Sequence, residues 1–250
     1  MSAQDDLRGL CGQLVVAASP EAVARRLAAD LVHALHDRLD QASAVHLALS
    51  GGSSPQGLYQ LLATGAGYGP GDWARTHVWL VDERCVPDDD PRLNFGMIRS
   101  TLVDHVPIPP AQVHPMPVGL PDGDRCYEND LRGALASGRI DAAVLGMGPD
   151  GHTASLFPRS PALDERQAWV RFNDGDRVTA PRPRMTLTYP ILRTTRFLVV
   201  LVTGAAKHPA LRAAARTPDD LHTYPIVGIR PADDGRLVWY LDRAAVEGSS

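Results

Sequence analysis

Four short apolar runs, each followed directly by a polar or glycine-rich turn, most constrain what this chain can fold into. The runs cover residues 45–49, 76–81, 140–145 and 197–202, and the turns begin at Ser50, Asp82, Gly146 and Thr203. Runs of this length that are bounded by turn residues are typical of buried strands in a parallel sheet. The carboxyl ends of parallel strands lie along one edge of a sheet, where α/β proteins bind ligands. We therefore expect the four turns to converge on one site.

Helical patterns alternate with these runs. Ser19-Pro20-Glu21 combines an N-cap residue, a proline at the first helical position and an early acid, and apolar residues then recur at every fourth position from Val23 to Leu35. Further strands are predicted at residues 13–17 and 237–241, and residues 185–192 are predicted as a helix or an extended piece. Because no Ser-, Gly- or Pro-rich linker divides the 250 residues, we expect a single α/β domain over residues 1–250.

The composition limits the partners of the chain. The formal net charge is −4 and basic residues never exceed two in a row, which argues against a nucleic-acid or membrane-surface partner. The three cysteines form no Cys-x-x-Cys pair, as expected of reduced thiols in a cytoplasmic protein. No apolar run approaches the roughly 20 residues of a membrane span, and no charged-then-apolar leader opens the chain. His105 and His114 lack ligand spacing and no cofactor fingerprint is present, so neither a metal nor a cofactor is expected.

The turn at residues 50–55, Ser-Gly-Gly-Ser-Ser-Pro, joins a strand to a helix. Free amide N–H groups and hydroxyls in such a turn point at one spot, and the positive end of the helix dipole supports them, so the turn suits a phosphate. It is neither a P-loop nor a dinucleotide fingerprint, and an ordinary tight turn is the alternative. Lys207, just past Gly204, is placed either to reach an anionic ligand or to lie on the surface.

Two other turns carry ionisable groups. Asp82-Glu83-Arg84 costs desolvation energy unless its charges bind a ligand or each other, and both interpretations stay open. The glycines of residues 146–158 place His152 at a strand tip, which makes it our candidate for proton transfer, with a glycine-rich turn that merely contains a histidine as the alternative. Together, these turns indicate hydrolysis or isomerisation of a phosphorylated small molecule by acid–base groups.

The ordered set of motifs resembles the 6-phosphogluconolactonase family, hydrolases of the oxidative pentose phosphate pathway. The motifs are SGGSSP at 50–55, DERCVP at 82–87, NFG at 94–96, GMGPDGHTASLFP at 146–158 and TGxxK at 203–207. The resemblance extends in the same order over residues 13 to 243 and implies a three-layer, Rossmann-like, mostly parallel sheet with helices on both faces. It also implies an enzyme without metal or cofactor, whose partner is a small sugar phosphate. We expect a monomer or a small homo-oligomer.

The resemblance also implies roles for single residues. It assigns substrate binding to Gly51, Gly52, Ser53, Arg84, Asn94, Gly148, Arg184 and Lys207, and catalysis to His152, Asp82 and Asp150. The three cations and the amides of residues 51–53 would fix the 6-phosphate. His152, oriented by Asp82 or Asp150, would take a proton from the water that attacks the carbonyl of 6-phospho-D-glucono-1,5-lactone. Backbone N–H groups of residues 148–152 or a nearby cation would stabilise the oxyanion. Ser155 is not in a Gly-x-Ser-x-Gly motif and is not expected to be a nucleophile.

One segment departs from the family pattern. Where members carry Ser-Pro-Lys-Pro-Pro ahead of the Arg-x-Thr-Leu-Thr motif, residues 177–181 read Arg-Val-Thr-Ala-Pro, so Arg177 or Arg182 would replace the phosphate contact of the missing lysine. Glucosamine-6-phosphate deaminase/isomerase activity is an alternative, but that motif has a Glu five residues after the His, where this chain has Phe157. A non-catalytic sugar-phosphate-binding module is the second alternative.

Overall fold

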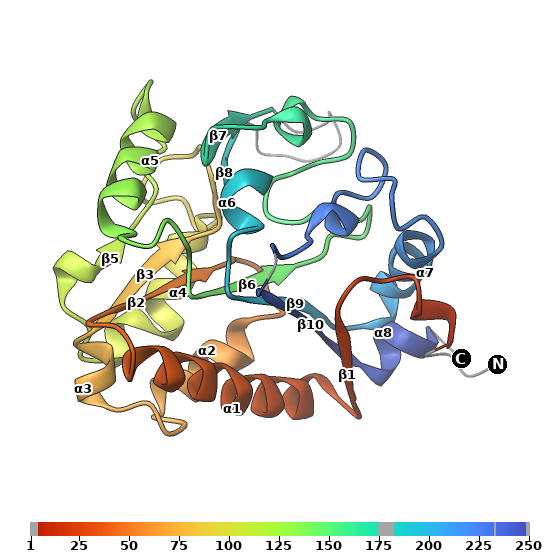
Figure 1. The fold of residues 1–250 in the computed structure, drawn as a ribbon, viewed down its shortest axis with the longest axis horizontal. Coiled ribbons are helices and arrows are strands. Elements are labelled where there is room, and N and C mark those ends of the chain that lie inside the picture. Colours follow the sequence, from red (N-terminus) through yellow and green to blue (C-terminus); the bar gives the residue numbers. More distant parts are fainter. Residues whose placement is uncertain (1–4, 175–182, 233, 249–250) are drawn as a thin grey trace.

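A seven-stranded sheet forms the centre of the computed structural model, which describes residues 5–174, 183–232 and 234–248. Its strands are all parallel and run in the order β1-β10-β9-β6-β2-β3-β5 (Figure 1). They are β1 (Gln13–Ala17), β2 (Val45–Leu49), β3 (Thr76–Leu80), β5 (Val113–His114), β6 (Ala142–Gly146), β9 (Phe197–Val202) and β10 (Arg236–Asp242). The four apolar runs thus form β2, β3, β6 and β9, which are neighbours in the sheet.

Helices cover both faces of this sheet, which confirms the predicted three-layer α/β fold. They are α1 (Pro20–Leu39), α2 (Gln56–Ala63), α3 (Pro70–Trp73), α4 (Asn94–Thr101), α5 (Gly123–Ala134), α6 (Tyr189–Leu192), α7 (His208–Arg216) and α8 (Arg243–Glu247). Six 3-10 turns add η1 (Asp5–Leu7), η2 (Val103–His105), η3 (Pro110–Gln112), η4 (Pro161–Asp164), η5 (Ala205–Lys207) and η6 (Pro225–Gly228). Figure 1 shows α1, α2 and α3 along one side and α5 and α6 along the other. None of the helices in the described ranges has the length and apolarity needed to cross a membrane.

The local sequence explains why these elements form. Ser19 caps α1, because its side chain accepts a hydrogen bond from the N–H of Ala22 and Pro20 occupies the first turn. All six residues of β9 are buried, since this strand has a partner on each edge and is covered on each face. A strand in that position needs a continuous apolar sequence rather than an alternating one.

A second, antiparallel sheet stands on the α5 side of the molecule and was not predicted. It contains β4 (Asp82–Arg84), β8 (Arg184–Leu187) and β7 (Val170–Asn173), in the order β4-β8-β7. The segment 185–192, predicted as a helix or an extended piece, is both: β8 ends at Leu187 and α6 begins at Tyr189. The polar turn expected at Asp82 is therefore a short strand, which continues from β3 through Val81 into the second sheet.

Candidate active site

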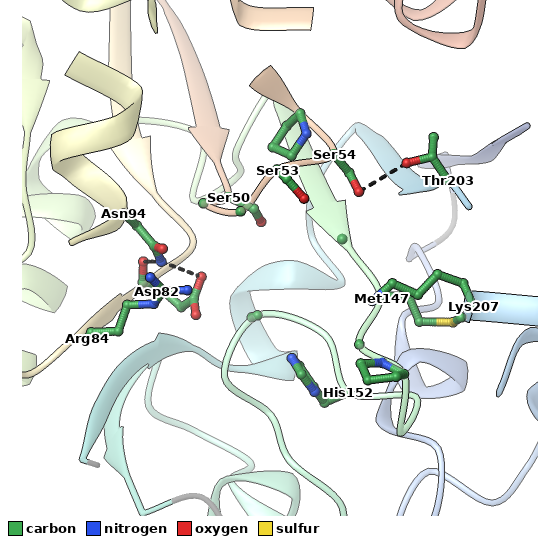
Figure 2. A pocket seen from close by; sticks show the side chains of 17 residues that line it. Ser50, Ser53, Ser54, Asp82, Arg84, Asn94, Met147, His152, Thr203 and Lys207 are labelled. Carbon is green, nitrogen blue, oxygen red and sulfur yellow. Dashed lines mark hydrogen bonds between the residues drawn. The ribbon is translucent and has the colours of Figure 1, made fainter. Parts of the chain in front are cut away.

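The turns after β2, β3, β6 and β9 surround one cavity of about 350 Å³ at the carboxyl edge of the large sheet (Figure 2). The predicted convergence of the four turns is confirmed, because residues of all four line the same cavity. The lining comprises Ser50, Gly51, Gly52, Ser53, Ser54, Pro55, Asp82, Arg84, Asn94, Gly146, Met147, Gly148, Pro149, His152, Ala154, Thr203 and Lys207. Cavities of this size in proteins hold small-molecule ligands.

The loop of residues 50–55 lies on the cavity and precedes α2. The hydroxyl of Tyr59 donates a hydrogen bond of 2.7 Å to the carbonyl of Ser50 and so ties the loop to the helix. The backbone N–H groups of Gly52, Ser53 and Ser54 have no hydrogen-bond partner among the described residues. Gly52 has a φ of +95°, in the region that favours glycine. Free N–H groups at the start of a helix form a site for an anion.

His152 lies in a turn that is held together by its own hydrogen bonds. The N–H of Gly148 donates to the carbonyl of His152 at 2.8 Å, and the N–H of Gly151 donates to the carbonyl of Gly148 at 3.1 Å. The imidazole packs against the ring of Phe157, with 4.9 Å between ring centroids. A Cβ at Gly148 would lie 2.1 Å from Nδ1 of His152, so the ring occupies space that only glycine leaves open.

Asp150 is the carboxylate that contacts His152. The distance between Nδ1 of His152 and Oδ1 of Asp150 is 2.6 Å, and the same oxygen accepts the backbone N–H of His152 at 3.1 Å. Burial alone would raise the pKa of Asp150, but the hydrogen bond and the charge of His152 hold it below its usual value. With Nδ1 engaged, Nε2 is the ring nitrogen available for proton transfer. Of the two aspartates left open by the sequence, Asp150 is the one in contact.

The turn cannot supply most of the expected oxyanion donors. The N–H groups of Gly148, Gly151 and His152 are already used within the turn, so the expectation that they face an oxyanion is wrong for these three. Gly148 still lines the cavity with its backbone. Lys207, which also lines the cavity, is a cation close enough to this turn for the charge of Asp150 to act on it, while burial lowers the pKa of its amine.

Asp82 has other partners than His152. Its Oδ2 accepts a hydrogen bond of 2.6 Å from the hydroxyl of Ser155, and its Oδ1 accepts one of 3.3 Å from Nδ2 of Asn94. Nδ2 of Asn94 also donates to the carbonyl of Asp82, at 2.9 Å. Asp82 is only 9% exposed, yet it lines the cavity.

Glu83 is a structural residue that caps α4. Its carboxylate accepts hydrogen bonds from the backbone N–H groups of Arg84, Asn94 and Phe95, at 2.7 to 2.8 Å. Burial raises its pKa, against these hydrogen bonds. The second carboxylate of the Asp-Glu-Arg motif therefore binds the backbone at the N-terminus of α4 and of Arg84, and among the described residues it forms no ion pair with the Arg84 guanidinium.

The predicted phosphate-binding cations occupy different places. Arg84 lines the cavity and donates to the carbonyl of Arg92, and Figure 2 shows it on the opposite side from Lys207. Arg184 lies next to Arg84 in β8, is 5% exposed and is not among the lining residues. Burial and the charge of Arg84 lower the pKa of Arg184. Arg177 and Arg182 lie outside the described residues.

Several lining residues were not predicted as site residues. Ser54 and Thr203 lie within 3.2 Å of each other, hydroxyl to hydroxyl, and join the loop after β2 to the end of β9 (Figure 2). Their position directly after apolar strands was the available signal. Among the described residues, no group of His, Cys, Asp and Glu side chains is arranged to hold a metal ion.

Comparisons with known proteins point to one family. The family described as glucosamine-6-phosphate isomerases/6-phosphogluconolactonase matches residues 18–239. The GDH/6PGL endoplasmic bifunctional protein of Oryctolagus cuniculus is 39% identical over 243 residues, which are 94% of this chain and 30% of that protein. The 6-phosphogluconolactonase of Synechocystis sp. is 40% identical over 211 residues, which are 80% of this chain and 83% of that protein. The structure of 6-phosphogluconolactonase from Trypanosoma cruzi is similar with a TM-score of 0.82 at 26% identity, over 95% of this chain and 97% of that one.

Proposed function

Because the chain belongs to the family of glucosamine-6-phosphate isomerases and 6-phosphogluconolactonases, we propose that it hydrolyses 6-phospho-D-glucono-1,5-lactone to 6-phospho-D-gluconate. The observation that carries this proposal is that His152, which Asp150 contacts, lines the same cavity as residues 52–54 with their free N–H groups. A base and an anion site in one cavity of this size match a phosphorylated ester substrate.

The phosphate is assigned to the side of the cavity where the loop and Lys207 lie. Ser54 contacts Thr203, which comes four residues before Lys207, so the loop and this amine share one side. Arg84 faces the cavity from the other side and adds positive potential there, and Arg184 is its partner on the neighbouring strand β8. Binding at the phosphate positions the distant lactone carbonyl, which contributes orientation rather than chemistry.

His152 acts as the general base. Nε2 takes a proton from a water molecule as its oxygen bonds to C1 of the lactone, and Asp150 keeps the other ring nitrogen protonated and stabilises the imidazolium. The bond from C1 to the ring oxygen then breaks, and the imidazolium returns its proton to that oxygen. The product is the open-chain carboxylic acid, which releases its remaining proton to solvent and becomes the carboxylate, so water and the protein are enough to balance the reaction.

The main alternative is the deaminase/isomerase activity of the same family. The position of the Glu that assists that reaction holds Phe157, which is 2% exposed and packs against the imidazole of His152. The phenyl group of Phe157 has no ionisable proton to transfer, so lactone hydrolysis is favoured over deamination. The expected cytoplasmic location and the monomeric or small homo-oligomeric state stay predictions.

Direct assays separate these possibilities. Purified protein is incubated with freshly generated 6-phosphogluconolactone and, in parallel, with glucosamine 6-phosphate. We expect faster-than-spontaneous lactone hydrolysis and no release of ammonia. Ammonia release would favour the deaminase, and binding of 6-phosphogluconate without turnover of either compound would favour a non-catalytic binding module.

A further inference from the structure

Asp82 is a buried carboxylate that has acceptor capacity to spare and no ion pair among the described residues. It is 9% exposed, and within the described ranges its carboxylate receives hydrogen bonds from two neutral side chains and forms no ion pair. An ionised carboxylate can accept about four hydrogen bonds, and burying one with unused acceptor capacity is costly. Because Asp82 lines the cavity, its free lone pairs are available to a ligand that donates hydrogen bonds.

Ser155 is built to hold this carboxylate in place. Its hydroxyl lies 2.6 Å from Oδ2 of Asp82, although 73 residues separate the two along the chain. The Ser155 backbone is fixed independently of that hydroxyl, since its N–H donates to Oγ1 of Thr186 at 3.1 Å and its carbonyl accepts from Nδ2 of Asn173 at 2.8 Å. Ala154, with a φ of +50°, turns the chain directly before it. Removing the Ser155 hydroxyl therefore takes away the shorter of the two hydrogen bonds to the Asp82 carboxylate, while the backbone contacts stay.

We propose that Ser155 is a positioning residue for sugar recognition: its hydroxyl holds the Asp82 carboxylate toward a hydroxyl group of the bound sugar phosphate. This inference rests on the proposed function, and it gives Asp82 a role other than orienting His152, which Asp150 contacts instead. The hydrogen bond from Ser155 to Asp82 joins the loop that carries His152 to the side of the cavity where Asp82 and Asn94 lie. Figure 2 shows Asp82 and Asn94 on that side. Polyol hydroxyls are the donors that such an acceptor selects.

The test compares two buried serines of the same loop. Ser155→Ala removes the donor to Asp82, and Ser160→Ala is the matched control, because Ser160 is 5% exposed and its hydroxyl accepts from Asn173 at 2.9 Å rather than contacting Asp82. We expect Ser155→Ala to raise the KM for 6-phosphogluconolactone about 10-fold or more, the scale of a hydrogen bond to a charged group, with a smaller change in kcat. Each variant loses one buried hydroxyl, so we expect Ser160→Ala to lower the melting temperature about as much as Ser155→Ala does. Unlike Ser155→Ala, it should leave KM unchanged.

Two further measurements assign the effect to the sugar and to Asp82. By calorimetry, Ser155→Ala should weaken binding of 6-phosphogluconate and leave binding of inorganic phosphate unchanged. The double variant Ser155→Ala/Asp82→Asn should lose no more affinity for 6-phosphogluconate than Asp82→Asn alone, because the serine acts through the carboxylate. Additive losses, equal weakening of phosphate, or a Ser155→Ala enzyme with wild-type KM would overturn the inference. If the wild-type protein does not hydrolyse the lactone, the proposed function fails and this inference with it. If the wild type is active, any of the three variant outcomes above overturns the inference alone.

Discussion

The contact between His152 and Asp150 depends on the residue between them. The two residues are separated only by Gly151, whose φ of +82° bends the chain so that the carboxylate meets Nδ1 and the backbone N–H of the histidine. A Cβ at Gly151 would lie 2.7 Å from the ring of Tyr224, so glycine is required here by conformation and by space. The result is an imidazole with a fixed orientation and one nitrogen free.

The first prediction concerns this imidazole. His152→Gln should lower kcat by about 10²–10⁴, the usual contribution of a positioned general base, with little change in KM. The side chain is 25% exposed and the turn keeps its backbone hydrogen bonds, so the melting temperature should stay close to that of the wild type. Steady-state kinetics and thermal unfolding measure the two effects. A variant that retains more than about a tenth of wild-type kcat would remove His152 from the mechanism.

The second prediction concerns the two cations that face the cavity from opposite sides. Lys207→Ala and Arg84→Ala should each raise the KM for 6-phosphogluconolactone about 10- to 150-fold, which corresponds to about 1.5–3 kcal/mol for a hydrogen bond to a charged group. Lys207→Ala should in addition abolish the preference of the enzyme for the phosphorylated lactone over unphosphorylated gluconolactone, because the phosphate is assigned to the side of the cavity where Lys207 lies.

Lys207→Arg, which keeps the charge, is the control and should retain most of the preference. Equal hydrolysis of phosphorylated and unphosphorylated lactone by the wild-type enzyme would instead show that the loop of residues 50–55 is not a phosphate site.

At the scale of elements, the approach of α4 to the loop after β2 determines which residue fits at position 51. A Cβ on Gly51 would lie 1.9 Å from Oδ1 of Asn94, the first residue of α4, which is 3% exposed and held by Asp82. The third prediction is that Gly51→Ala destabilises the protein by about 1–3 kcal/mol, the cost of overpacking a filled site, and also lowers activity.

Gly57→Ala is the matched control for that change. Gly57 lies inside α2, where an added Cβ would make an ordinary contact of 3.6 Å with Ala24. The substitution should therefore be neutral or stabilise by about 0.5–1 kcal/mol, because alanine loses less backbone entropy in a helix. Denaturant unfolding of both variants measures the difference, and equal free energies of unfolding would contradict the steric argument.

Some strands of the fold could be predicted from the sequence and others could not. The runs at 45–49 and 197–202 correspond to β2 and β9 at both ends, because buried parallel strands have a continuous apolar sequence. The second sheet could not be predicted in this way, since β4 consists of three polar residues whose pairing with β8 is about 100 residues distant.

The same limit applies to the site. Position after a strand predicted His152, Lys207 and the loop of residues 50–55, all of which line the cavity. The contact of Ser155 with Asp82 and the pairing of Arg184 with Arg84 depend on how distant segments pack, for which the local sequence carries no signal.

At the scale of the whole molecule, the ligand site and a histidine cluster lie in different parts of the large sheet. The cluster consists of His46 on β2, His77 on β3 and His114 on β5, around Trp79. Nδ1 of His77 lies 2.9 Å from Nε2 of His114, the indole of Trp79 stacks on His114, and the indole N–H donates to Nδ1 of His46 at 3.1 Å. These contacts suit neutral imidazoles, because two of them require a ring nitrogen that accepts a hydrogen bond.

The last prediction follows from the protonation of this cluster. Burial lowers the pKa of His46 and of His114 to about 4, and it also lowers that of His77; only Asp141 acts in the opposite direction, on His46. The unfolded chain binds protons at His46 and His114 near pH 6.5 and the folded protein only near pH 4, so between these values the unfolded state holds more protons. Stability is therefore fully present above about pH 6.5 and is lost as the pH falls toward 4.

Thermal unfolding at about pH 7 and about pH 5 tests this, since the second value lies inside the window. His114→Phe keeps an aromatic ring against Trp79 but cannot be protonated, so its melting temperature should fall less between the two pH values than that of the wild type. His33→Gln is the control, because the His33 side chain is 77% exposed and lies outside the cluster, and it should follow the wild type. If the melting temperature of His114→Phe falls as much as that of the wild type on acidification, the acid sensitivity comes from other groups, and the half-buried histidine cluster does not set the lower pH limit of the fold.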